Sequence, residues 1–304
     1  MYSNSTYSVI MTAFNAEDTI EEALKSALAF DIPASRIVVV DDKSADSTVR
    51  ILQNYVQKDS RVNLVCNSSN LGQSKSRNIG VNIAKSEFLI FMDDDDFSFP
   101  NRASLHLEAL ISGNDISYVS TSKQYPGGYR AQFENSEFTF MGEYQEELIR
   151  YLLLGEKQNL FSRVFSPSCA MAARRSSFLS LGGFSEEMRR LEDIDFVCRA
   201  IEAKLHINWS PKVALLRLHT LGEDKTFEAN AKGELDLLDA FANYFTQRER
   251  LSFKTMVRIR GSYFSRKALS LLLSLPQVFL LLFIDPKRII SMLNRLVHDY
   301  RRKK

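Results

Sequence analysis

The sequence is short of cysteine and of glycine, and both shortages exclude classes of protein. Its three cysteines, Cys66, Cys169 and Cys198, are far apart and form no CxxC pair, so neither a cysteine zinc site nor a disulfide framework is expected. We expect them to be small buried side chains in a reducing compartment. Only twelve glycines are present, and they form neither the dinucleotide fingerprint GxGxxG nor the phosphate loop GxxxxGKS/T. A dehydrogenase and an NTPase are therefore disfavoured.

The amino terminus lacks a basic segment followed by a long apolar run. No signal peptide is therefore expected, and we predict that the protein stays in the cytoplasm. With 304 residues, 45% of them hydrophobic and 25% charged, the chain has the composition of an ordinary globular protein. Its length allows one large domain with an appendage.

Charge is divided unevenly along the chain. From residue 252 to 304, twelve Lys and Arg residues stand against two Asp residues, a net charge of +10. The whole chain carries +2, so residues 1–251 carry −8. An acidic body with a basic tail indicates two parts with different tasks. We expect a body over 1–230 and a helical extension over 231–304.

Apolar runs alternate with helical spacing over the first hundred residues. Continuous apolar runs separated by helices predict an α/β fold with a mostly parallel sheet covered on both faces. Asp18 or Asn15 is the expected cap of the first helix. Strands are expected at 7–11, 36–40, 62–66 and 88–92, and helices at 20–28, 49–56 and 74–84.

The rest of the body is less regular. Trp209 is expected to pack in the core rather than to line a site. Further strands are expected at 116–121, 138–141, 170–173 and 212–218, and further helices at 145–154, 192–203 and 232–250.

Acidic residues follow two of the predicted strands. Asp93 to Asp96 come directly after 88–92, and Asp41 and Asp42 after 36–40. Parallel α/β sheets bind ligands at the carboxyl ends of their strands, and adjacent carboxylates are held together more easily when a cation offsets their charge. Such hard oxygen ligands suit Mg²⁺ or Mn²⁺. The alternative is a solvated acidic turn or a helix cap.

A third acidic group opens the predicted helix at 192–203. Glu192 and Asp193 would lie in its first turn, where the helix dipole favours carboxylates, so capping is one explanation. The other is a general base, which needs a carboxylate within hydrogen-bond reach of an acceptor hydroxyl.

Four segments together resemble glycosyltransferase family 2, whose members have the GT-A fold. The likeness covers about residues 7–220 with order and spacing intact, and the chain beyond 230 lies outside it. Lys43 departs from the family, in which glycine is common after the acid pair. The four segments are SVIMTAFNAEDTIEEALKSAL (strand, turn and helix), RIVVVDDKSADST (the acid pair), NLGQSKSRNIGVNIAKSEFLIFMDDDDFSFP (ending in the DxD motif and a proline) and LGGFSEEMRRLEDIDFVCRA (the GGF turn and ED helix).

The resemblance implies a binding site for a nucleotide-sugar donor. The ring of Phe14 would stack on the base and Asp42 would hydrogen-bond it, while Arg77 would lie near the phosphates. The residues implied to bind the nucleotide sugar are Thr12, Phe14, Asn15, Asp41, Asp42, Arg77, Asp93 and Asp94.

The resemblance also implies a metal site and a catalytic pair. Asp95 would bind Mn²⁺ or Mg²⁺ directly, with Asp93 at the other defining position of the DxD motif. His219 would be a further metal or diphosphate contact, although a lone histidine is as readily structural. Asp193 would be the catalytic base, and Glu192 would contact the acceptor or the donor sugar.

The implied reaction is a single displacement that inverts the anomeric carbon. The donor is expected to be a UDP-sugar, with GDP- and dTDP-sugars as alternatives, and the acceptor to be a surface glycan or a lipid-linked sugar. A nucleotidyltransferase would share the sheet and the acidic site, but its triphosphate would need basic residues in the turn TAFNAED, which has none. A silent sugar-nucleotide-binding or scaffold protein is the third interpretation, and the intact DxD and ED motifs argue against it.

The basic tail has an apolar centre. Residues 268–284 carry no charge, contain Pro276 and are flanked by Lys and Arg on both sides. A run of about 17 residues is at the lower limit for a membrane span, and basic flanks on both sides oppose a simple span. We expect an interfacial or re-entrant helix pair on the anionic inner face of the cell membrane. A hairpin packed on the body or on another subunit is the alternative, and no nucleic-acid partner is expected.

Overall fold

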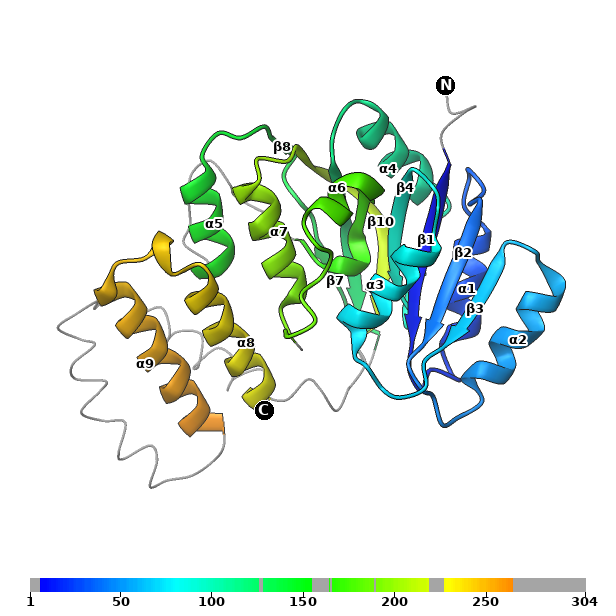
Figure 1. Cartoon of the computed structure of the whole chain (residues 1–304), viewed down its shortest axis with the longest axis horizontal. Helices are drawn as coiled ribbons and strands as arrows, with labels where there is room; N and C mark the ends of the chain where they lie inside the picture. The colour runs from blue at the N-terminus through cyan, green and yellow to red at the C-terminus, as the bar shows by residue number, and fades with distance from the viewer. Residues whose placement is uncertain are drawn as a thin grey trace. The chain divides into compact units, whose positions relative to one another are not determined.

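The computed structural model describes residues 6–125, 128–154, 164, 166–188, 190–218 and 227–264 (Figure 1). The chain divides into two compact units, residues 1–221 and 222–304. Within the described residues, no helix combines the length and the apolar character that a membrane crossing requires. The apolar segment 268–284 and His219 lie outside the described residues.

The first unit is built on one ten-stranded mixed sheet in the order β3-β2-β1-β4-β9-β6-β10-β5, with β7 paired to β6 and β8 to β10. Figure 1 shows β1, β2 and β3 side by side. The first four strands are parallel, and β9 lies antiparallel between β4 and β6. The strands are β1 (Tyr7–Ala13), β2 (Arg36–Asp41), β3 (Val62–Cys66), β4 (Phe88–Asp93), β5 (Asp96–Ser98), β6 (Ile116–Gln124), β7 (Arg130–Phe133), β8 (Phe138–Phe140), β9 (Met171–Arg174) and β10 (Ile207–Leu218).

Helices cover both faces of this sheet. Helix α3 packs against β1 and β2 through Gly80, where an added Cβ would lie 2.8 Å from Ile10 and 3.4 Å from Val40. The opposite face carries α1, α2 and α4. The helices of this unit are α1 (Ile20–Leu28), α2 (Thr48–Lys58), α3 (Gln73–Ile83), α4 (Arg102–Ile111), α5 (Gln145–Leu154), α6 (Arg175–Ser180) and α7 (Glu192–Glu202), with the 3-10 turn η1 (Ser168–Ala170).

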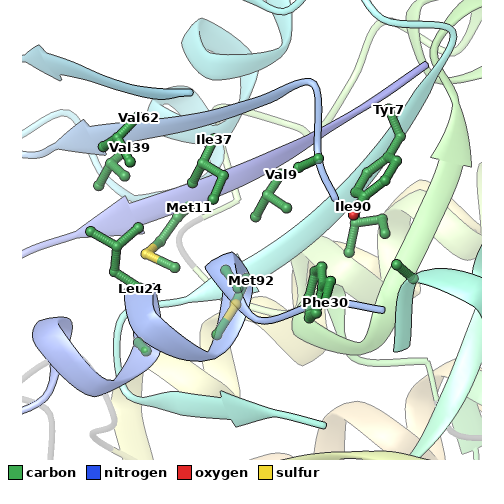
Figure 2. Close-up of a cluster of buried hydrophobic side chains, with 14 of the residues drawn as sticks. Tyr7, Val9, Met11, Leu24, Phe30, Ile37, Val39, Val62, Ile90 and Met92 are labelled. Carbon is green, nitrogen blue, oxygen red and sulfur yellow. The ribbon is translucent and has the colours of Figure 1, made fainter. Parts of the chain in front are cut away.

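A large hydrophobic cluster lies between the sheet and α1, α2 and α4 (Figure 2). Alternate residues of the parallel strands enter it, among them Val9, Met11 and Val39, and Leu24 of α1 closes over them. Each such side chain contributes roughly 1.5–3 kcal/mol by leaving water. The strands are apolar on both faces because helices cover both, so the sequence shows continuous apolar runs there rather than alternation.

Several expectations need correction. The first helix has Thr19 at its N-cap with no capping side chain, because Asn15 uses its side-chain oxygen to accept a hydrogen bond from Ala45 N. Cys66 is exposed at the end of the sheet's outermost strand. Strand β10 begins at Ile207 rather than 212, because Pro211 interrupts the pattern without ending the strand. The elements β5, α4, β7 and α6 were not predicted.

The described residues of the second unit form two helices where one was predicted over 232–250. Helix α8 (Phe227–Ala240) and helix α9 (Gln247–Phe264) are joined by the 3-10 turn η2 (Ala242–Tyr244). A capping box starts α9: Glu249 N donates to Thr246 Oγ1, and Thr246 N donates to the Glu249 carboxylate. Asp239 accepts hydrogen bonds from Arg250 and Lys254 across the pair.

Candidate active site

The parallel register brings the predicted site residues to one edge of the sheet. Thr12 of β1 pairs with Asp93 of β4, and Ala13 pairs with Asp41 of β2. The carboxyl ends of three neighbouring strands therefore deliver the acid pair and the start of the four-aspartate run to the same place. This is the edge at which α/β sheets bind ligands.

Two turns at this edge are tied together by Asn15. Its backbone N–H donates to Ser44 Oγ at 2.9 Å, and its side-chain oxygen accepts from Ala45 N at 2.8 Å. The ring of Phe14 stays 47% exposed beside them. Lys43 has φ +70°, in the left-handed region that glycine adopts without strain, which explains why the resembling family favours glycine at this position.

The two carboxylates of the acid pair are used differently. Asp42 accepts hydrogen bonds from Asn67 Nδ2, Leu71 N and Gly72 N, all at 2.8 Å. It therefore closes the loop that leads into α3. Asp41 accepts from Ser44 N, while its Oδ1 is buried with no hydrogen-bond partner among the described residues. Of the two, Asp41 thus retains a buried acceptor with no partner in the described part of the chain.

Arg77 joins two of the acidic motifs. Its guanidinium is 1% exposed and donates to Asp93 Oδ1 at 2.6 Å and to Glu192 Oε1 at 2.8 Å. It lies 5.5 Å from the centroid of the Phe184 ring. The planar guanidinium forks between the two carboxylates, as lysine cannot. The DxD strand end and the ED helix are therefore linked through one buried cation.

The residue after Arg77 explains the GGF turn. Asn78 Nδ2 donates to Phe184 O, and Phe184 N donates to Asn78 Oδ1. Gly183 has φ +75°, and an added Cβ would lie 2.6 Å from Asn78 Oδ1. Only glycine fits there, so the separation of about 100 residues between SRN and GGF reflects direct contact.

Asp193 stands at the start of α7 with a perturbed carboxyl group. Burial, and after it the neighbouring charge of Glu192, raises the pKa of Asp193 to about 7. A carboxylate whose pKa lies near the working pH is suited to take up a proton. Asp195 on the same turn has a structural task, since it pairs with Arg199 at 2.6 Å, and Arg199 also holds the carbonyls of Leu181 and Gly183.

The four-aspartate run is crowded and partly buried. Burial, followed by the charge of Asp95, raises the pKa of Asp94 to about 7, and Asp94 Oδ2 accepts from Phe14 N at 2.9 Å. Burial also raises the pKa of Asp96 well above its usual range, with Asp93 adding to the effect. This accumulation of carboxylates favours a cation nearby.

Two carboxylates in one group of three side chains suit a hard divalent cation, whereas the thiol of the group does not. Ligand atoms of Asp93, Asp96 and Cys169 lie within 4.8 Å of one another, and Asp96 Oδ2 is buried with no hydrogen-bond partner in the described part of the chain. Carboxylate oxygens of this kind fit Mg²⁺ or Mn²⁺. Asp95, predicted to bind the metal directly, lies outside this group of three, and its assignment stays a prediction.

Arg217 was missed by the sequence reasoning, although it stands two residues before His219. It pairs in register with Asp96 of β5, and the pKa of its guanidinium is raised, chiefly by neighbouring Cys169 against the opposing effect of burial, with Asp96, Asp93 and Asp193 adding. A basic residue inside an apolar strand was the available signal. Arg217 supplies a cation facing the acidic cluster.

Arg102 supports the cluster from within the fold. It is fully buried and donates to the carbonyls of Phe91 and Cys169, both at 2.6 Å, and to Ser98 Oγ at 2.8 Å. These three residues lie on the segments that carry or border the cluster. Burial lowers the pKa of Arg102 to about 10. Trp209 packs in the core as predicted and donates to Ser166 Oγ.

Solved structures share this architecture. S. aureus TarS (residues 1–349), in its complex with UDP-GlcNAc, matches with a TM-score of 0.60 and 21% identity over 94% of this chain and 83% of that one. The same protein with UDP matches with a TM-score of 0.56 over 86% of this chain and 73% of that one. A mixed sheet with acidic residues at the ends of its parallel strands thus defines a GT-A-like α/β protein.

The chain belongs to glycosyl transferase family 2, whose model matches residues 8–182, more than half of the sequence. This confirms the family indicated by the sequence. An uncharacterized glycosyltransferase of Haemophilus influenzae is 26% identical over 64% of this chain and 62% of its own length. The UDP-Glc:α-D-GlcNAc-diphosphoundecaprenol β-1,3-glucosyltransferase WfaP of Escherichia coli is 30% identical over 44% of this chain. The matches span 62% and 49% of these two relatives.

Proposed function

We propose that this protein is a metal-dependent, inverting glycosyltransferase of surface-polysaccharide synthesis. It moves a sugar from a nucleotide-diphosphate sugar, a UDP-sugar above all, to a hydroxyl of a glycan or lipid-linked acceptor. Similarity to WfaP, whose name states a UDP-Glc donor and a diphosphoundecaprenol-linked acceptor, and to TarS, solved with UDP and UDP-GlcNAc, supports these two substrate classes.

One observation carries the proposal: Arg77 connects the acidic end of β4 to α7, the helix that carries the proposed catalytic base Asp193. It holds Asp93 and Glu192 at 2.6 and 2.8 Å, and Asp193 follows directly in the chain with a pKa near 7. A displacement requires that the donor sugar and the catalytic base be held in a fixed relative position, because a small displacement of either one lowers the reaction rate steeply. A shared buried cation provides that relation.

The residues of the chain divide the chemistry between them. Asp193 accepts the proton of the attacking acceptor hydroxyl, and Glu192 orients a sugar beside it. Phe14 stacks on the nucleotide base, and the acid pair accepts from a base N–H, through Asp42 as the resemblance implies or through Asp41 Oδ1, which has no partner among the described residues. Attack from the face opposite the departing diphosphate inverts the anomeric carbon.

The acidic run would hold the metal. Asp93 and Asp95 are the proposed DxD positions, and Asp96 Oδ2 is a further oxygen with no partner among the described residues. When bound, Mn²⁺ or Mg²⁺ offsets negative charge on the diphosphate. His219, outside the described residues, is proposed as an additional contact.

The tail is proposed to place the enzyme where its acceptor is. Twelve basic residues around the uncharged run 268–284 suit an anionic leaflet. We therefore infer a cytoplasmic enzyme that is peripheral on the inner face of the cell membrane, where a lipid-linked acceptor would be presented.

A thermal-shift panel tests the proposal directly. UDP, GDP and dTDP are each added with Mn²⁺ and with EDTA. UDP with Mn²⁺ is expected to raise the melting temperature, since a ligand at about 100 times its Kd stabilises by about 2.7 kcal/mol, and EDTA is expected to abolish the shift. No shift with any nucleotide would overturn the donor site, and UDP binding without sugar transfer to any acceptor would indicate a binding protein.

A further inference from the structure

A pair of tyrosines stands at the tip of the β6–β7 hairpin. Tyr125 N donates to Tyr129 O at 2.8 Å, which extends the pairing of the two strands by one step. The two rings lie 5.7 Å apart at an angle of 39°. Tyr129 is 64% exposed, and the Lys123 ammonium lies 5.4 Å from the centroid of the Tyr125 ring.

Tyr125 and Tyr129 lie at the edge of the sheet that carries the acidic cluster. Strand β9 runs antiparallel to both β4 and β6, so β4 and β6 are parallel and end at the same edge. Asp93 ends β4, and the two tyrosines follow β6.

The register gives the separation between hairpin and cluster. Arg217 pairs with Lys123 on one side and with Asp96 on the other. With strands about 4.8 Å apart, the backbones of Lys123 and Asp96 are separated by roughly 10 Å. Paired residues project to the same face of a sheet, so Lys123 and Asp96 share the face of Arg217. Tyr125 stands only two residues, about 7 Å, further along.

An exposed tyrosine ring at this place suits a sugar. A tyrosine offers a rigid apolar face and a hydroxyl with little conformational entropy to lose, and a pyranose presents an apolar C–H face bordered by hydroxyls. The ammonium of Lys123 adds a hydrogen-bond donor beside the rings. The register places this position beside the cluster, at a distance where the part of a glycan behind its reacting residue would lie.

We propose that Lys123, Tyr125 and Tyr129 form an acceptor subsite, in which the Tyr129 ring stacks on a pyranose of the glycan that receives the new sugar. This inference rests on the proposed function, because it assigns the acceptor of that reaction to a glycan with at least two sugar units.

Saturation-transfer NMR on the full chain tests the subsite. The probes are cellotriose, maltotriose and the β-1,4 trimer of N-acetylglucosamine, each with UDP and Mn²⁺. We expect transfer to the C–H protons of at least one trisaccharide. Tyr129→Ala should weaken its binding about fivefold, and Tyr129→Phe, which keeps the ring, should retain it.

Tyr144→Ala is the matched control. Tyr144 is 49% exposed and follows β8, which pairs with the beginning of β10 and so ends at the opposite edge of the sheet. The variant should bind the trisaccharide as the unaltered chain does. Binding of none of the three probes, or equal losses in Tyr129→Ala and Tyr144→Ala, would overturn the subsite.

Two further readouts separate the outcomes. Mn²⁺-dependent UDP binding without any trisaccharide signal would refute the acceptor subsite and leave the proposed function intact. Trisaccharide binding without UDP binding would refute the proposed function. Flotation with phosphatidylglycerol vesicles, and sedimentation, show whether Tyr129→Ala instead alters membrane binding or self-association. A change in either, with sugar binding unaltered, would assign the hairpin to a membrane or a second copy and overturn the proposal.

Discussion

At the scale of single residues, the site depends on carboxylates whose surroundings differ. Asp42 is occupied with three hydrogen bonds from the chain, while Asp41 has a buried oxygen with no partner among the described residues. Asp193 is buried beside Glu192 and titrates near pH 7. Neighbouring acids of the same type thus have separate tasks, and each task can be removed on its own.

Replacement of the base tests the assignment of Asp193. Asp193→Asn should keep Mn²⁺-dependent UDP binding and lose about 10²–10⁴-fold in transfer rate, because an amide cannot accept the proton. Release of UDP from a UDP-sugar in the presence of an acceptor measures the rate. Asp195→Asn is the control on the same turn. It should lower the free energy of unfolding, because it weakens the pair with Arg199, and leave the rate of the chemical step unchanged. Wild-type turnover by Asp193→Asn would show that another group is the base.

The pH dependence follows from the same carboxyl group. A general base works when ionised, so transfer should be low below pH 6, rise with a midpoint near the pKa of about 7 and level off above it. UDP binding measured over the same range separates the chemistry from donor binding. A profile that is flat from pH 5.5 to 8 would contradict the raised pKa of Asp193.

Arg77 allows a stability test. Arg77→Met leaves the carboxylates of Asp93 and Glu192 without their buried partner, and breaking such a pair costs about 3–5 kcal/mol. Arg77→Lys should lose less stability than Arg77→Met, because lysine keeps the positive charge but lacks the planar guanidinium that donates to both carboxylates. Urea unfolding gives the free energies. Arg61→Met is the control, since Arg61 pairs with Asp59 in a partly exposed bridge and should cost at most about 1 kcal/mol.

At the scale of elements, the close packing of α3 on the sheet depends on Gly80. Gly80→Val would place a branched side chain where even a Cβ lies 2.8 Å from Ile10, so the free energy of unfolding should fall by about 1–3 kcal/mol. Asn82→Val introduces the same side chain on the exposed side of this helix and should cost at most about 0.5 kcal/mol. Equal losses in the two variants would mean that helix propensity, and not packing, decides.

The elements also show what a sequence can predict. Strands β1 to β4 were predicted because helices on both faces make them continuously apolar. Helix α4 was missed because its buried face includes Arg102 and His106, which break the apolar period. Arg217 was missed because its place in the site depends on pairing with Asp96, about 120 residues earlier in the chain, and no local pattern reports that contact.

At the scale of the whole molecule, the charge asymmetry predicts where the protein is found. The full chain should bind vesicles containing phosphatidylglycerol at low salt, bind zwitterionic vesicles weakly, and come off the anionic vesicles as salt approaches about 0.5 M, where charges are screened within a few ångströms. Neutralising Arg301, Arg302, Lys303 and Lys304 with glutamine should weaken the binding. A full chain that stays unbound at low salt would contradict the proposed membrane role of the tail.

The strand order also has a consequence for how the protein is made. Strand β9 fits between β4 and β6, and β10 between β6 and β5, yet both leave the ribosome long after the strands they join. Strand β4 has an open edge until β9 has emerged at residue 174, and β6 has one until β10 has emerged at residue 218. Open edges of this kind invite pairing with other chains. The nascent body is therefore expected to need protection through most of its translation, and Arg217 meets Asp96 only when β10 pairs with β5.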